Sequence, residues 1–249
     1  MSYPAVDIRD VSFKYAGQPT SLFNHINLCV DSGERFGLFG PNGAGKTTLM
    51  SLMTGLLRGW EGDIRLLGNT IKTKSKFINT LFGYVPQDFS FYEELTAVEN
   101  LAFFGAWSGL SKKEITVRTS ELLGILGLTN VQHKPVCKLS GGMKRKVNLA
   151  IGVIHQPKIL FLDEPTTGVD VQAGRDIINY LLLLNKNGTT LIYTSHQLNE
   201  AEGLCRQIAL IDNGKIIAND LLVNLLAQHQ QKGLEELFLG LTGNSYTST

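Results

Sequence analysis

A glycine-rich segment, GPNGAGKTT at residues 40–48, has the residue types and spacing of a phosphate-binding loop. Its glycines would let successive backbone N–H groups curve around phosphate oxygens, and the positive end of a following helix would add to the attraction. Lys46 is expected to reach the β- and γ-phosphates, and the Thr47 hydroxyl to ligate Mg²⁺. The segment predicts a site for a nucleoside triphosphate with Mg²⁺, formed by Gly40, Pro41, Asn42, Gly43, Ala44, Gly45, Lys46, Thr47 and Thr48.

Two adjacent carboxylates follow an apolar run, ILFLDEP at residues 159–165. Asp163, at the end of the expected strand, is placed to hold the hydration shell of Mg²⁺. Glu164 could face an attacking water and act as its general base. The alternative is that one of the acids merely caps the next turn. Together with the phosphate loop, the pair favours hydrolysis of the nucleotide over simple storage, with Lys46 and Glu164 as catalytic residues.

A second anion site is predicted where LSGGMKRK, residues 139–146, opens a helix. The Ser140 hydroxyl and the flexible amides of Gly141 and Gly142 would lie at the positive end of that helix. One domain seldom needs two phosphate sites for a single nucleotide. Two copies packed head-to-tail could use both, because each Ser-Gly-Gly turn would close on the nucleotide held by the other copy's phosphate loop.

The elements that must position these motifs alternate between strands and helices. Apolar or β-branched runs predict buried strands at residues 35–39, 81–85, 159–162, 190–194 and 208–211. Helical spacing predicts a helix over residues 47–57 and a later one, with apolar stripes formed by Leu49, Leu52, Met53 and Leu56 and by Ile177, Leu181 and Leu184. The alternation indicates an α/β fold with a mostly parallel sheet and a P-loop NTPase core.

Two regions depart from this alternation. In residues 6–13 and 26–30, apolar and polar residues alternate well enough to predict a small N-terminal antiparallel sheet. Residues 96–138 have helical character without a convincing strand, which predicts a helical subdomain inserted into the core. We therefore expect a single domain over residues 1–243, with a core at 1–87 and 139–220, a helical insert at 88–138, a C-terminal helical segment at 221–243 and a tail at 244–249.

The composition excludes some classes of function. The chain has 249 residues and a net charge of +1, so no general attraction to nucleic acid is expected. No apolar run approaches the roughly 18 residues of a membrane span, and residues 1–10 lack a signal-peptide stretch, so a cytoplasmic location is expected. Cys29, Cys137 and Cys205 are dispersed and are expected to be free thiols.

A guanine-nucleotide switch is disfavoured because the NKNG segment at 185–188 lacks the acid of an Asn-Lys-x-Asp motif.

With these motifs in this order, the sequence closely resembles the ATP-binding cassette (ABC) family over about residues 6–243. The resemblance implies that Tyr15 stacks on adenine and that Asp170 lies in the loop joining the two monomers' sites. It also implies that Gln87 senses Mg²⁺ and contacts a membrane subunit, and that His196 contacts the γ-phosphate. The alternatives are ordinary packing for Tyr15, a polar loop role for Gln87, helix N-capping by Asp170 and simple burial of His196.

Departures from the commonest family pattern resemble the exporter branch. Met143 stands where many members have glutamine, Lys-Arg-Lys follows it, and LEELFLGLTG at residues 234–243 resembles the ending of exporter subunits. That ending could instead be an ordinary amphipathic packing helix. We expect an ATP-driven clamp of two identical cassettes on the inner face of the cell membrane, which powers export through a separate transmembrane subunit. An importer subunit is the main alternative, and a non-transport ABC ATPase is less favoured.

Overall fold

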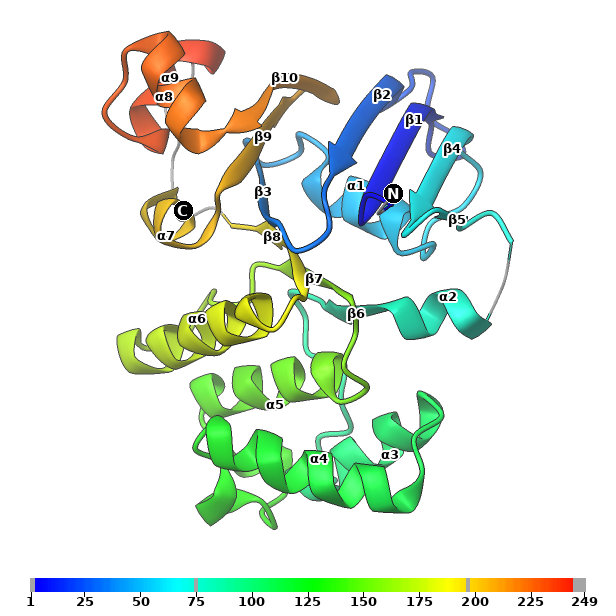
Figure 1. The fold of residues 1–249 in the computed structure, drawn as a ribbon, viewed down its shortest axis with the longest axis vertical. Coiled ribbons are helices and arrows are strands. Elements are labelled where there is room, and N and C mark those ends of the chain that lie inside the picture. Colours follow the sequence, from blue (N-terminus) through cyan, green and yellow to red (C-terminus); the bar gives the residue numbers. More distant parts are fainter. Residues whose placement is uncertain (1–2, 74–75, 196–197, 244–249) are drawn as a thin grey trace.

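The computed structural model describes residues 3–73, 76–195 and 198–243. A central six-stranded sheet has the order β10-β9-β3-β8-β7-β6 (Figure 1). Its strands are β3 (Arg35–Phe39), β6 (Phe82–Val85), β7 (Ile159–Asp163), β8 (Thr190–Thr194), β9 (Gln207–Asp212) and β10 (Lys215–Leu221). The strands from β9 to β6 pair in parallel, and β10 pairs antiparallel to β9. The predicted α/β fold with a mostly parallel sheet is confirmed.

Residues of the central strands alternate between two hydrophobic cores on opposite faces of this sheet. In β7, Leu160 and Leu162 join one core, whereas Ile159 and Phe161 join the other. The helices of the first core are α3 (Ala97–Trp107), α4 (Lys112–Ile125), α5 (Gly141–Val153), α6 (Val171–Lys186), α7 (Leu198–Leu204), α8 (Leu222–His229) and α9 (Leu234–Thr242); α1 (Lys46–Met53) and α2 (Lys76–Leu81) contribute to the second. Burial on both faces explains why these strands are continuously apolar.

A smaller sheet, in the order β2-β1-β4-β5, packs over the second core (Figure 1). It consists of β1 (Val6–Phe13), β2 (Phe23–Val30), β4 (Glu61–Leu66) and β5 (Asn69–Thr70), paired antiparallel throughout. In β2 the buried Ile26, Leu28 and Val30 alternate with exposed residues, as expected for a sheet with one solvated face. The predicted antiparallel sheet is present, and it extends to two strands that the sequence did not predict.

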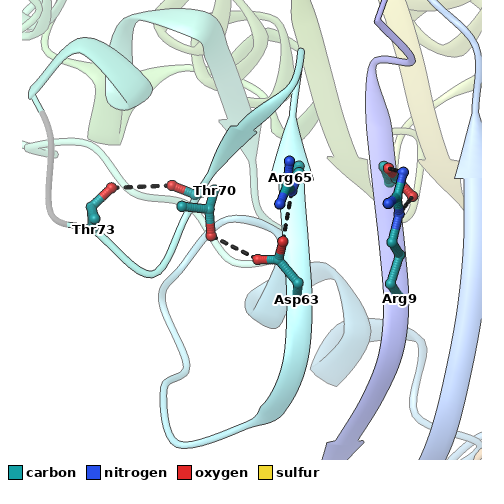
Figure 2. Close-up of polar contacts among 6 residues, drawn as sticks. Arg9, Asp63, Arg65, Thr70 and Thr73 are labelled. Carbon is teal, nitrogen blue, oxygen red and sulfur yellow. Dashed lines mark hydrogen bonds and ion pairs between the residues drawn. The ribbon is translucent and has the colours of Figure 1, made fainter.

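Some polar contacts on this smaller sheet join residues that are close in the sequence (Figure 2). Arg9 pairs with Asp7 at 2.7 Å within β1, and Arg65 pairs with Asp63 at 2.6 Å within β4. The Thr70 hydroxyl donates to Asp63 at 2.7 Å and so joins β5 to β4. Because the arginine heads are largely in contact with solvent, we expect each pair to contribute little to stability.

The residues predicted to form a helical insert contain α3 and α4, followed by two short 3₁₀ turns at Thr129–Val131 and Val136–Lys138. Both helices begin with a capping box: Thr96 with Glu99, and Ser111 with Glu114. Figure 1 shows α3 and α4 at the end of the molecule away from the smaller sheet. The division of the chain into core, insert and C-terminal segment stays a prediction.

Residues 234–242 form α9, which packs against α7 and α8. Its buried face consists of Leu234, Leu237 and Phe238, all of which lie in the first core. The geometry is that of an amphipathic packing helix, which was the alternative to a branch-specific role. Within the described residues, no helix combines the length and the apolar character needed to cross a bilayer.

Several predicted boundaries were wrong. The helix after the phosphate loop ends at Met53 rather than Leu57, because Gly55 adopts a left-handed conformation (φ 70°) and turns the chain away. Leu56, predicted on the buried stripe, is therefore 64% exposed. Leu81 ends α2 instead of starting a strand, and β6 begins at Phe82.

Candidate functional site

The predicted phosphate loop connects the end of β3 to the start of α1, at the edge of the sheet where ligands of open α/β proteins bind. Gly40 has no room for a side chain, since a Cβ there would lie 2.1 Å from the Ile211 carbonyl oxygen. Gly43 and Gly45 adopt φ angles of 80° and 110°, which only glycine reaches at little cost. The glycines are therefore required by the path of the backbone itself.

Lys46 is folded back into this loop. Its Nζ donates to the carbonyl oxygens of Gly40 at 2.7 Å and Pro41 at 3.1 Å, and the residue is 8% exposed. Burial lowers the pKa of the Lys46 ammonium, while the nearby charges of Glu164 and Asp163 act in the opposite direction. The structure thus brings the lysine of the loop close to the predicted carboxylate pair.

Asp163 ends β7 and is almost fully buried. Its Oδ1 accepts a hydrogen bond of 2.6 Å from the Thr194 hydroxyl on β8. Burial raises the pKa of the Asp163 carboxyl, while the nearby Thr194 and Thr47 side chains and the charge of Lys46 act to lower it. The hydroxyl and carboxylate expected to meet Mg²⁺ therefore lie near one another.

Glu164 has a left-handed backbone (φ 51°), a conformation that costs a non-glycine residue about 1–2 kcal/mol. Its backbone N–H donates to the Thr194 carbonyl oxygen at 3.1 Å. Its Oε2 accepts hydrogen bonds from Gln87 Nε2 at 3.1 Å and from the Thr167 hydroxyl at 3.2 Å. Two side chains thus fix the position of this carboxylate, Gln87 from the loop after β6 and Thr167 from the turn that follows Glu164 itself, while β8 holds its backbone.

Two residues that the family resemblance brought forward lie at the rim of this site. Gln87 follows β6, is exposed, and reaches Glu164 as described. Tyr15 is 41% exposed; its ring meets that of Phe13 edge-on at 4.9 Å, and its hydroxyl lies 2.9 Å from the Thr48 Oγ1. The aromatic ring therefore stands beside the phosphate loop. His196 lies outside the described residues.

The Ser-Gly-Gly turn forms a separate group with Asp170. Ser140 is the N-cap of α5 and accepts a hydrogen bond of 3.3 Å from the Met143 N–H. Asp170 is the N-cap of α6 and accepts from the Ala173 N–H at 2.9 Å. A Cβ at Gly142 would lie 2.7 Å from Ala173 Cβ and 3.0 Å from an Asp170 carboxylate oxygen, so the two helix starts are in close contact.

Sequence reasoning missed the residues that brace these motifs. Thr194 and Thr167 hold the two carboxylates, and Arg145 of α5 donates to the backbone of both Gln87 and Thr167. Arg145 was noticed only as part of a Lys-Arg-Lys run. Its contacts are distant in the sequence, so no local pattern points to them.

Comparison with known proteins decides the family. Residues 23–167 match the family model described as ABC transporter. The chain belongs to the ABC transporter family. It is 38% identical to the linearmycin resistance ATP-binding protein LnrL of Bacillus subtilis, over 92% of this chain and 76% of that protein. It is 38% identical to the Nod factor export ATP-binding protein I of Sinorhizobium fredii, over 86% of this chain but 62% of that protein, less than two thirds of its length.

A solved ATP-binding subunit of an ABC transporter has the same architecture as this ABC cassette. It is 29% identical, with a TM-score of 0.87, and the match covers 96% of this chain and 99% of that one. The predicted family and fold class are thereby confirmed. The chain is an ATP-binding and ATP-hydrolysing cassette of the ABC transporter type.

Proposed function

We propose that this ABC cassette powers export through a separate membrane-spanning subunit, with two cassettes closing over ATP. The proposal for its chemistry depends on one observation: the Glu164 carboxylate is held by Gln87 and Thr167 beside the buried Asp163 and Lys46. A carboxylate fixed next to the phosphate loop can orient and deprotonate a water that attacks the terminal phosphate.

The phosphate loop supplies the binding energy for ATP. Its backbone amides and the start of α1 would surround the phosphates, and Lys46 would exchange its loop carbonyl partners for phosphate oxygens. Thr47 and Asp163 fit Mg²⁺, since the Thr47 side chain lies near enough to act on the pKa of the Asp163 carboxyl, and hard oxygen donors are what this ion prefers. When bound, Mg²⁺ neutralises charge on the phosphates; Gln87 would face it from the rim.

Glu164 is proposed as the general base. Its carboxylate would accept the proton of the attacking water, while Gln87 and Thr167 keep Oε2 in place. His196, which follows β8 and lies outside the described residues, is proposed to contact the γ-phosphate. Tyr15 is proposed to stack on adenine because its exposed ring lies beside Thr48 of the loop.

The Ser-Gly-Gly turn is proposed to complete the nucleotide site of a second cassette. Ser140 and Gly141 are exposed at the start of α5, where unpaired amides and the helix dipole favour an anion. Asp170 is exposed at the neighbouring start of α6 and would lie in the same interface. A homodimer satisfies the proposal, because this chain carries both halves of the site.

Export is favoured by the names of the two relatives, which refer to linearmycin resistance and Nod factor export, and by Met143 with the basic residues that follow it. The membrane subunit would meet the exposed loop around Gln87, which would place the cassette at the inner face of the cell membrane. An importer subunit and a non-transport ABC ATPase are the alternatives; no nucleic-acid partner is proposed.

Purification of the tagged chain from detergent-solubilised membranes tests this assignment. We expect one membrane-spanning protein to co-purify in constant ratio, and its sequence to mark it as an export permease. Co-purification with ribosomes or DNA instead would contradict the transporter proposal. A permease that requires a solute-binding protein would replace export with import.

A further inference from the structure

Arg145 is a buried arginine on the helix that starts at the Ser-Gly-Gly turn. It is 5% exposed, although it is flanked by two lysines that pair with carboxylates at the surface. Lys144 lies 3.5 Å from Glu93, and Lys146 lies 2.6 Å from Asp176. Burial lowers the pKa of the Arg145 guanidinium, while the charges of Asp88 and Glu164 act to raise it. Removing this charge from solvent is costly, so its contacts need a specific explanation.

The guanidinium is directed at backbone carbonyls from two different loops. Nη1 donates to the carbonyl oxygen of Gln87 at 2.7 Å and to that of Pro86 at 3.3 Å. Nη2 donates to the Thr167 carbonyl oxygen at 3.3 Å, and the group lies 4.9 Å from the centre of the Phe89 ring. One planar head therefore joins the loop after β6 to the loop after Glu164.

The side chains of these same two residues hold the proposed general base. Gln87 and Thr167 both donate to Oε2 of Glu164, at 3.1 and 3.2 Å. Arg145 fixes their backbones from one side, and they fix the carboxylate on the other. The carboxylate position thus depends on Arg145 through two independent routes.

Asn148 strengthens one of these routes. It is 1% exposed on the same helix, and its Nδ2 donates to the Pro86 carbonyl oxygen at 3.2 Å. Its Oδ1 accepts from the Ser90 N–H at 3.4 Å. The loop that carries Gln87 is therefore attached to α5 by two buried side chains.

We propose that Arg145 is a positioning residue for Glu164, and that it links the start of α5 to the catalytic carboxylate of its own chain. The second part rests on the proposed function, in which the turn at Ser140 meets the nucleotide of a second cassette. A movement of α5 on closure would shift Arg145, and with it Gln87 and Thr167. Occupation of one site would then tighten or release the general base of the other.

Arg145→Lys and Arg145→Gln test the positioning role. Lysine keeps the charge but loses the planar fork that reaches both loops. Because small misplacement of a catalytic group can cost about a hundredfold in rate, we expect kcat to fall by roughly tenfold to a hundredfold. The KM for ATP and the affinity for a fluorescent ATP analogue should stay unchanged, since Lys46 and its loop are untouched.

Arg118→Lys is the matched control. Arg118 lies on α4 with a side chain 14% exposed, and it too donates to a backbone carbonyl, that of Ile154, at 3.4 Å. We expect this variant to keep the wild-type kcat. A parallel loss of kcat in both lysine variants, or a loss of ATP affinity in the Arg145 variants, would show a general structural effect and overturn the proposal.

Coupling to Glu164 separates this inference from the proposed function. In a Glu164→Gln background, Arg145→Lys should lower kcat no further, and its effect should be less than additive with Thr167→Val. If Glu164→Gln retains full turnover, the general-base assignment fails. If Glu164→Gln is inactive but both Arg145 variants turn over normally, only the role of Arg145 fails. The same conclusion holds if Glu164→Gln is inactive and neither Arg145 variant unfolds cooperatively.

Discussion

The two groups of site residues differ in how they are supported. Lys46, Asp163 and Glu164 are 8%, 2% and 9% exposed, and their side chains are held by hydrogen bonds from several segments of the same chain. Ser140 and Asp170 are exposed, and each accepts a hydrogen bond that caps its own helix. The first group is organised before any partner arrives, whereas the second presents groups outward.

This difference indicates which substitutions should depend on the presence of a second cassette. Preorganised polar groups in a buried site cost no rearrangement at the moment of reaction. Exposed helix starts bind an anion well only when other surroundings exclude water. We therefore expect substitutions in the buried group to act on ATP binding or chemistry within one chain, and substitutions at the helix starts to act only when two chains close.

The largest effect is expected from Glu164→Gln. The change removes the proposed general base but keeps the size of the side chain, so kcat should fall by about 10²–10⁴-fold. ATP affinity should be unchanged, and the stalled protein should double its mass in ATP and Mg²⁺ by light scattering. Glu121→Gln, which replaces a surface acid paired with Arg118, is the control and should leave kcat unchanged. If the stalled variant stays strictly monomeric, the proposed difference between the two groups fails, because the exposed group would then have no second cassette to bind.

Lys46→Ala should come next and act on binding. Charge-assisted hydrogen bonds contribute about 1.5–3 kcal/mol, which corresponds to roughly a tenfold to hundredfold weaker affinity for ATP. Titration calorimetry of the isolated chain measures it, with Lys158→Ala, an exposed lysine, as the control. Wild-type affinity in Lys46→Ala would remove the phosphate-loop assignment.

The motifs of the buried group could be predicted because each is local. The phosphate loop and the acid pair lie within single short segments, and the apolar strands that carry them are buried on both faces. The strands β4 and β10 were missed because exposed and half-buried polar residues interrupt their apolar positions. Gly55 shows the same limit for a helix end. The apolar stripe of the sequence continues to Leu56, but the helical backbone ends before Gly55.

The bracing of the site could not be predicted for a different reason. Arg145 and Thr194 act through contacts between segments that are far apart in the sequence. A buried arginine between two half-buried lysines looks like part of a charged run until the direction of its side chain is known. The fold determines that direction, because α5 packs against the loops that follow β6 and β7.

Ser140→Ala tests the exposed group, and Ser111→Ala is its counterpart elsewhere. Both serines are helix N-caps that accept a backbone N–H at 3.3 Å, so each change should lower the free energy of unfolding by about 1 kcal/mol. Only Ser140→Ala should also lower kcat, by roughly tenfold, because only this hydroxyl is proposed to meet a phosphate of the second cassette. Equal kcat in the two variants would leave Ser140 as a cap alone.

The smallest effect is expected from Asp63→Asn in the antiparallel sheet, because the hydrogen bonds of Asp63 go to Arg65 and Thr70 rather than to either group. Burial acts to raise the pKa of Asp63, but hydrogen bonds from Arg65 and Thr70 and the charges of Arg65 and Lys72 outweigh it, so the pKa is lowered. A lowered pKa stabilises the fold above the unfolded value of about 3.9, and this contribution is lost as the pH falls through the folded value. Urea unfolding should show the variant less stable by at most about 1 kcal/mol, equally at pH 7 and pH 5, with kcat unchanged. A change in kcat would mean that polar contacts of this sheet, and not only its packing in the shared hydrophobic core, support the buried group.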